Sequence, residues 1–262
     1  MHNTMKLTLI ILAVFTSLLV SAQTPNLVVP AKPTSQIASQ VKPAGPQADT
    51  LITKDPTRPN REYWVIKNAS GSVKMQGAMV NGQKDGAWRE YGSNNNMLLK
   101  MEEYTMGKKD GASTTFTNSG MVSLDETYRN DTLNGTRLTY SQGARLKVVE
   151  NFKKGQLDGE RKSFYDDGKV QEEGFYIAGN RDGLTKWFLQ SGTPSLEYTY
   201  KNGVLDGPSK SYDEKGAVKS EGNFVNDAEE GEWKEYVDGT LTKKIIYKNG
   251  NIIKEIPVPV KK

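Results

Sequence analysis

The feature that most constrains this chain is a dipeptide, an acidic or amide residue followed by glycine, that recurs at an almost constant interval. The interval is 25 residues once and 24 residues five times. The dipeptides are Asp85-Gly86, Asp110-Gly111, Asn134-Gly135, Asp158-Gly159, Asp182-Gly183, Asp206-Gly207 and Glu230-Gly231. Self-similarity at a period of this size is typical of repeat folds, in which each unit packs against its neighbours. We therefore expect tandem units rather than one thick core.

Aromatic and glycine columns divide each unit into two strands. Five residues after each dipeptide glycine lie Tyr91, Phe116, Tyr140, Phe164, Phe188, Tyr212 and Tyr236. Seven residues before each lie Met79, Tyr104, Tyr128, Phe152, Tyr176, Tyr200 and Phe224. A second glycine set is Gly71, Gly120, Gly143, Gly168, Gly192, Gly216 and Gly239. Glycine this frequent excludes helices, since each costs roughly 1 kcal/mol in a helix interior. The sequence predicts an all-β fold, an elongated single-layer antiparallel sheet of about seven two-stranded repeats and roughly fifteen strands.

The Asp-Gly dipeptides are predicted to form the tight hairpin turns, because glycine tolerates positive φ and Asp or Asn accepts the left-handed region. Calcium binding is the alternative role for these aspartates. Their spacing differs from the glycine-rich nonapeptides of calcium-binding β-rolls, so we expect no metal site.

Alternation along the strands assigns side chains to faces. Across hairpins we expect Tyr140 to lie opposite Leu146 and Phe164 opposite Val170. Three residues after the dipeptide glycines, four successive repeats carry Lys162, Lys186, Lys210 and Lys234. Parity predicts that these lysines lie opposite Phe152, Tyr176, Tyr200 and Phe224. Either the lysine stems cover the rings, or both together form a ladder that binds an anionic polymer or acidic partner.

The candidate binding face combines these aromatic and basic columns. Its residues are Tyr140, Phe164, Phe188, Tyr212, Tyr236, Tyr176, Tyr200, Lys162, Lys186, Lys210 and Lys234.

The N-terminal part of the chain predicts export. Leu7 to Val20 is almost wholly apolar and is followed by small residues, so residues 1–22 are expected to be a cleaved signal peptide. Residues 23–60 hold seven of the eleven prolines and are expected to be a disordered linker. The repeat domain should span 61–256 and a tail 257–262. We expect a bacterial protein, periplasmic or extracellular, with no transmembrane segment after signal cleavage.

Missing residue types exclude most enzyme mechanisms. The chain has no cysteine, and its one histidine, His2, lies within the expected signal peptide. Ser-His-Asp and Cys-His catalysis and the usual zinc ligand sets are therefore absent, and we expect a non-enzymatic protein without cofactors. The net charge of +4 at pH 7 comes from 35 basic and 31 acidic residues. Because basic and acidic residues are nearly equal in number, we expect no nucleic-acid partner.

The repeat resembles a known family. The run DGERKSFYDDG at residues 158–168, followed by Gly174, Phe175 and Tyr176, is similar to the bacterial variant of the MORN repeat, often labelled as an antitoxin component. The likeness covers about residues 62–250. It implies an elongated single-layer sheet used for assembly or for docking partners, with lipid binding proposed in some members. No motif residue is catalytic in that family, so no active site carries over.

These observations favour an exported β-repeat scaffold or binding module for a protein or envelope polymer. The alternative is a membrane-surface module that binds anionic lipid through the lysine column. A glycan hydrolase that uses a carboxylate pair remains the enzymatic possibility. A toxin-neutralising role fits poorly, because neutralising a cytosolic toxin requires no signal peptide.

Overall fold

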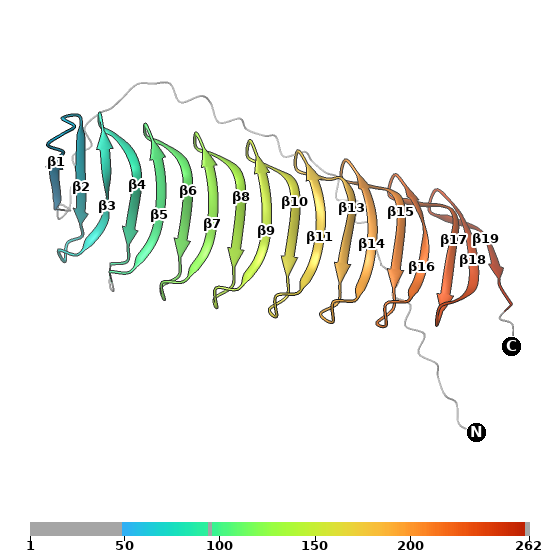
Figure 1. Ribbon diagram of the computed structural model, residues 1–262. Coiled ribbons are helices and arrows are strands. Elements are labelled where there is room, and N and C mark those ends of the chain that lie inside the picture. The colour runs from blue at the N-terminus through green and yellow to red at the C-terminus, as the bar shows by residue number, and fades with distance from the viewer. Residues whose placement is uncertain (1–48, 94–95, 260–262) are drawn as a thin grey trace. The chain divides into compact units, whose positions relative to one another are not determined.

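The repeat domain is one open antiparallel sheet in which successive strands are neighbours in space (Figure 1). The computed structural model describes residues 49–93 and 96–259, within one compact unit. The strands are β1 (Thr50–Lys54), β2 (Arg61–Lys67), β3 (Val73–Val80), β4 (Gln83–Tyr91), β5 (Leu98–Thr105), β6 (Lys108–Phe116), β7 (Val122–Arg129), β8 (Thr132–Tyr140), β9 (Leu146–Lys153), β10 (Gln156–Phe164), β11 (Val170–Ile177), β12 (Asn180–Arg181), β13 (Gly183–Phe188), β14 (Pro194–Lys201), β15 (Val204–Tyr212), β16 (Val218–Val225), β17 (Ala228–Val237), β18 (Thr240–Lys248) and β19 (Asn251–Pro257). The predicted all-β, single-layer antiparallel architecture is confirmed. At about 4.8 Å between strands, the sheet extends roughly 85 Å.

The chain reverses at a different place from the one predicted. Between β3 and β4, Val80 pairs with Gln83, so the turn consists of Asn81 and Gly82. Both turn residues have positive φ, 51° and 75°, as a two-residue type I′ turn requires. Asn202-Gly203 and Asn249-Gly250 repeat this geometry. The prediction that the Asp-Gly dipeptides form the hairpin turns is wrong. They lie four residues after the turns, inside strands except for Asp182, which separates β12 from β13.

Each dipeptide instead forms a bulge. Between β9 and β10, Leu157 pairs with Phe152 and Arg161 pairs with Glu150, so residues 158–160 face Asn151 alone. Gly159 takes φ +119°, and Asn151 Nδ2 donates to the Glu160 carbonyl at 2.8 Å. Such bulges bend a strand and increase its twist. They account for the curvature of the strands in Figure 1.

In four of the seven dipeptides, the acidic or amide member forms a hydrogen bond to the next repeat. Asp158 Oδ2 accepts a hydrogen bond from the Ala178 amide, at the following hairpin turn, with a distance of 3.3 Å. Equivalent bonds run from Lys154 to Asn134 (3.1 Å), from Asn202 to Asp182 (3.1 Å) and from Asn249 to Glu230 (2.8 Å). The recurrent dipeptide therefore has two structural tasks, a bulge at the glycine and an inter-repeat bond at its partner.

The register of the hairpins also differs from the one predicted for the lysines. Lys162 pairs with Val149 and Glu173, whereas the predicted register placed it opposite Phe152. A register that differs by an odd number of residues moves a side chain to the other face. The predicted placement of the lysines opposite the aromatic column is therefore wrong. The predicted pairs Tyr140–Leu146 and Phe164–Val170 are confirmed. They flank the other turn of each repeat, at Gly143 and Gly168, and do not depend on where the Asp-Gly dipeptide lies.

Two faces result, which we name by their contents. The tryptophan face carries all four tryptophans, Trp64, Trp88, Trp187 and Trp233, and the lysine face carries Lys162, Lys186, Lys210 and Lys234. Buried residues in the described chain lie mostly on the tryptophan face, in one row along its middle: Trp88, Ser113, Glu150, Thr185, Ser209 and Ile245. Because no second layer covers the sheet, these side chains are buried by one another.

The ordered domain begins earlier than predicted. Strand β1 pairs with β2 in register Ile52–Trp64, although residues 50–54 fall in the range expected to be linker. Buried Asp55 connects the two strands and accepts hydrogen bonds from the Thr57 hydroxyl and from the Thr57 and Arg58 amides. The expected domain boundary at residue 61 is therefore wrong. The signal peptide, residues 23–48 of the linker and residues 260–262 of the tail lie outside the described residues.

Candidate binding surfaces

Complementary side-chain sizes fill the middle row of the tryptophan face. Gly222 lies opposite Trp233, and a Cβ on Gly222 would overlap the indole ring. The same pairing joins Gly77 to Trp88. At Gly174 a Cβ would lie 2.8 Å from Oγ1 of Thr185, which is itself completely buried. This row is thus packed like a core, with large residues placed where the facing strand has none.

Charges of alternating sign continue this row across the middle of the sheet. Arg137 contacts Glu150 at 2.8 Å, and Glu150 contacts Arg161 at 3.4 Å. Arg161 contacts Glu172 at 3.2 Å, and Glu172 also pairs with Arg181. The five side chains come from β8, β9, β10, β11 and β12. Each charge therefore lies beside one of opposite sign, which makes its partial burial tolerable.

A second charged group occupies the N-terminal half of this face. Glu102 Oε1 lies 2.6 Å from Lys109 Nζ and 2.9 Å from Lys100 Nζ, and the Tyr104 hydroxyl donates to Oε2 at 2.8 Å. Burial alone would raise the pKa of Glu102, but the contacts with Lys109, Lys100 and Tyr104 lower it to about 2. Glu102 is therefore a charged structural group at neutral pH.

Aromatic rings complete the C-terminal part of the tryptophan face. Edge-to-face contacts connect Tyr198 to Phe224 at 5.8 Å, Phe224 to Trp233 at 5.1 Å and Trp233 to Tyr247 at 6.0 Å. The Arg181 guanidinium lies 5.7 Å from the Tyr176 ring centre and 5.6 Å from that of Tyr200. Tyr176 and Tyr200, two residues of the predicted binding face, are thus engaged within this face.

The lysine face carries a ladder of paired charges. Lys186 Nζ lies 3.8 Å from Glu197, Lys210 Nζ lies 3.4 Å from Glu221, and Lys234 Nζ lies 3.6 Å from Glu221. Lys162 contacts Glu160 at 2.7 Å and Glu173 at 3.8 Å. The predicted lysine column exists, but its charge is largely neutralised by glutamates on neighbouring strands.

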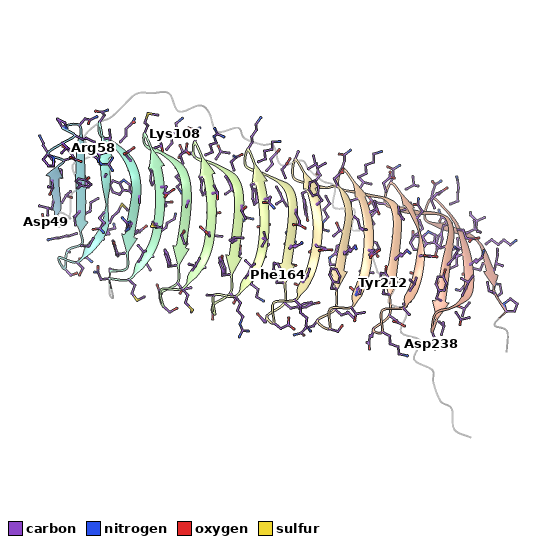
Figure 2. The ribbon with its side chains drawn as sticks, viewed as in Figure 1. Asp49, Arg58, Lys108, Phe164, Tyr212 and Asp238 are labelled. Atoms are coloured by element: carbon purple, nitrogen blue, oxygen red, sulfur yellow. The ribbon has the colours of Figure 1, made fainter. Side chains whose placement is uncertain are left out.

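The other predicted aromatics share the lysine face. Tyr140, Phe164, Phe188, Tyr212 and Tyr236 are half-buried at strand ends, and Phe164 and Tyr212 lie near the same rim as Asp238 in Figure 2. The Tyr236 hydroxyl donates to Glu221 at 2.8 Å. This bond, helped by Lys210 and Lys234, lowers the pKa of Glu221 against the effect of burial. The predicted binding face is therefore divided, with its tyrosines at 176 and 200 on one side and its other residues on the opposite side.

An exposed apolar cluster on the lysine face was missed by the sequence analysis. Phe175 is 47% exposed, Ile177 47% and Leu184 45%. Phe175 and Ile177 lie on β11, and Leu184 lies on the adjoining strand β13. In the preceding repeat the residues equivalent to Phe175 and Ile177 are Asn151 and Lys153. The detectable signal was Phe175, since the repeats on either side carry the polar residues Asn151 and Thr199 at its position.

The described residues provide no group of three or more Asp, Glu, His or Cys side chains able to hold a metal ion. Among the same residues, no helix is long and apolar enough to cross a membrane.

An open, single-layer sheet of hydrogen-bonded hairpins defines a class of protein, the β-repeat proteins. The two faces of the sheet are the surfaces available for binding. Three of its units, at residues 157–178, 181–202 and 205–226, match the family model described as the MORN repeat variant. The resemblance seen in the sequence is confirmed for these units, and the remaining hairpins continue the same sheet. No curated protein shows a significant match to the chain. MORN repeats are generally non-catalytic and mark a β-repeat binding or scaffold module.

Proposed function

We propose that this chain is an exported, non-enzymatic scaffold that binds a protein partner along its lysine face. The observation that carries the proposal is the exposed cluster of Phe175, Ile177 and Leu184. Exposed apolar residues surrounded by polar ones are typical of protein-binding surfaces. The tryptophan face is a weaker candidate, because its aromatic side chains contact one another and its charges are paired.

Export rests on the N-terminal sequence. An apolar run of about 14 residues before Val20-Ser21-Ala22 supports signal cleavage better than membrane anchoring, since a spanning helix needs roughly 20 residues. We therefore propose that the protein is periplasmic or extracellular. Fractionation of cells that express the full chain tests this, and an uncleaved protein in the cytosol would contradict it.

Anionic lipid is the second candidate ligand. The ion pairs of Lys186, Lys210 and Lys234 argue against lipid binding. Attraction to a lipid surface requires unneutralised positive charge. A glycan hydrolase and a toxin-neutralising protein have no supporting contact among the described residues.

The test uses the protein purified from cells expressing the full chain. The double variant Phe175→Ser/Leu184→Ser should reduce recovery of the specific partner in envelope pull-downs about tenfold, as expected for loss of apolar anchors. Val237→Ser removes an apolar residue that is 60% exposed at the sheet rim, more than Phe175 or Leu184, and should leave recovery unchanged. The proposal would be overturned if Phe175→Ser/Leu184→Ser and Val237→Ser recovered equal amounts of the partner. It would also be overturned if the protein captured polysaccharide or anionic vesicles and no protein.

A further inference from the structure

A hollow of 320 Å³ opens on β2, β3 and β4, at the N-terminal end of the sheet. Two arginines, Arg61 and Arg89, line it. Its other lining residues include the small or apolar side chains of Val65, Ala78 and Ala87. The hollow therefore combines positive charge with an apolar floor.

Arg89 differs from the other basic residues of its column. It occupies the position of Lys162, Lys186, Lys210 and Lys234, three residues after a dipeptide glycine. Each of those lysines contacts at least one glutamate. The partners of Arg89 in the sheet are Gln76 and Met101, both uncharged. Within the described residues, Arg89 is thus the member of this column that lacks a carboxylate.

Gln76 accounts for the difference. It occupies the position that Glu221 holds in the last repeat, where Glu221 pairs with Lys234 and accepts a bond from Tyr236. Gln76 keeps the corresponding tyrosine contact, since its Nε2 donates to the Tyr91 hydroxyl at 2.7 Å. The first repeat therefore retains the hydrogen bond to the tyrosine, but it lacks the negative charge that Glu221 supplies in the last repeat.

The nearby carboxylates are engaged elsewhere. Asp85 lines the hollow but accepts a bond from Arg61 Nη1 at 2.7 Å. Glu103, opposite Ala87, accepts a bond from the Ala112 amide at 3.0 Å. Arg61 Nε is buried and has no hydrogen-bond partner. A ligand cannot reach that buried atom and Asp85 neutralises Arg61, so the donors that the hollow offers are those of Arg89, which forms no ion pair or side-chain hydrogen bond among the described residues.

We propose that this hollow binds a carboxylate group of a peptide partner, presented beside an apolar side chain. Arginine recognises carboxylates through paired N–H donors, and Arg89 is the unneutralised group that supplies them. Val65, Ala78 and Ala87 receive the adjacent apolar group. The inference rests on the proposed function in that it adds a second contact point to the same lysine face.

The test is titration of the ¹⁵N-labelled protein, purified from cells expressing the full chain, with N-acetyl-L-phenylalanine. Amide shifts are expected to cluster at residues 61–65, 76–78 and 87–89. The uncharged analogue, N-acetyl-L-phenylalanine amide, should bind roughly tenfold more weakly, as expected for loss of one charge-assisted hydrogen bond.

Three variants give the test its specificity. Gln76→Glu supplies the carboxylate that the later repeats possess, so it should abolish binding while the protein stays folded. Arg89→Gln should weaken binding about tenfold. Lys234→Gln, the matched control at the same column position, should bind like the unaltered protein.

Unchanged affinity in both Gln76→Glu and Arg89→Gln, or equal binding of the acid and its amide, would overturn the proposal. The titration contains no envelope partner, so its failure would leave the pull-down result for Phe175 and Leu184 unaffected. A failed pull-down would likewise leave carboxylate binding in the hollow intact.

Discussion

At the scale of single residues, the bulge glycines carry the strictest requirements. Gly207 has φ +135°, a conformation that L side chains rarely adopt. A Cβ at this position would also lie 2.9 Å from Cβ of Thr199. Thr199 itself closes the bulge, because its hydroxyl donates to the Pro208 carbonyl at 2.8 Å. Backbone angle and available space therefore both select glycine here.

Gly207→Ala is expected to destabilise the protein by about 2–3 kcal/mol, because the alanine is strained and displaces Thr199. Chemical denaturation followed by circular dichroism measures this change. Gly143→Ala is the control, since Gly143 lacks a positive φ and has open space where a Cβ would lie. A similar loss in both variants would show that the bulge imposes no special demand.

At the scale of the strands, ion pairs connect neighbours across the tryptophan face. Glu102 on β5 holds Lys109 on β6, and Glu150 on β9 holds arginines on β8 and β10. Glu102 therefore connects β5 to β6, and Glu150 connects β9 to both of its neighbouring strands. Their charge is consequently part of the stability of the sheet.

Acid should weaken this connection at Glu102 in a defined range. Its pKa falls from 4.5 to about 2 in the folded protein, so the stabilisation is complete above pH 4.5 and is lost as the pH falls toward 2. Glu102→Gln should cost about 2 kcal/mol at pH 7, and the difference from the unaltered protein should shrink at pH 3. Urea unfolding midpoints at both pH values measure it.

The control is Glu214→Gln, which changes an exposed carboxylate outside the described ion pairs. A deficit of Glu102→Gln that is the same at pH 3 and pH 7 would contradict a stabilising role for its charge.

At the scale of the whole molecule, the sheet behaves as a one-dimensional array. Each described hairpin contacts the hairpin before it and the one after it, and the two edges are β1 and β19. Stability in such arrays is nearly a sum of local and nearest-neighbour contributions. Damage at one end should therefore remain at that end.

Ile245→Ala tests this locality. Ile245 on β18 is 4% exposed, and its truncation should cost about 2–4 kcal/mol. Hydrogen exchange should accelerate in β17, β18 and β19 and stay slow in β3 to β8. Ile253→Ala, at a residue 64% exposed, should change neither region. Uniform acceleration along the chain would show that the sheet unfolds as one cooperative unit instead.

The sequence alone was sufficient for the class of fold. A 24-residue period with a glycine in each strand pair excludes helices and predicts a repeated hairpin, and cross-strand pairs such as Tyr140–Leu146 follow from local turn geometry. Period and composition are properties of the chain itself. No long-range contact is needed to read them.

The tertiary structure decided which residues share a surface. The chain turns at Asn202-Gly203 and the following Asp206-Gly207 forms a bulge, a choice between two similar dipeptides that the hydrogen bond between Asp182 and the Asn202 amide helps to fix. Residues that pair across these two-residue turns differ in number by an odd value, so Tyr176 and Tyr200, which lie ten residues before Lys186 and Lys210, fall on the opposite face from the lysines. The hollow beside Arg89 likewise depends on which strands are adjacent, and adjacency is a property of the assembled sheet.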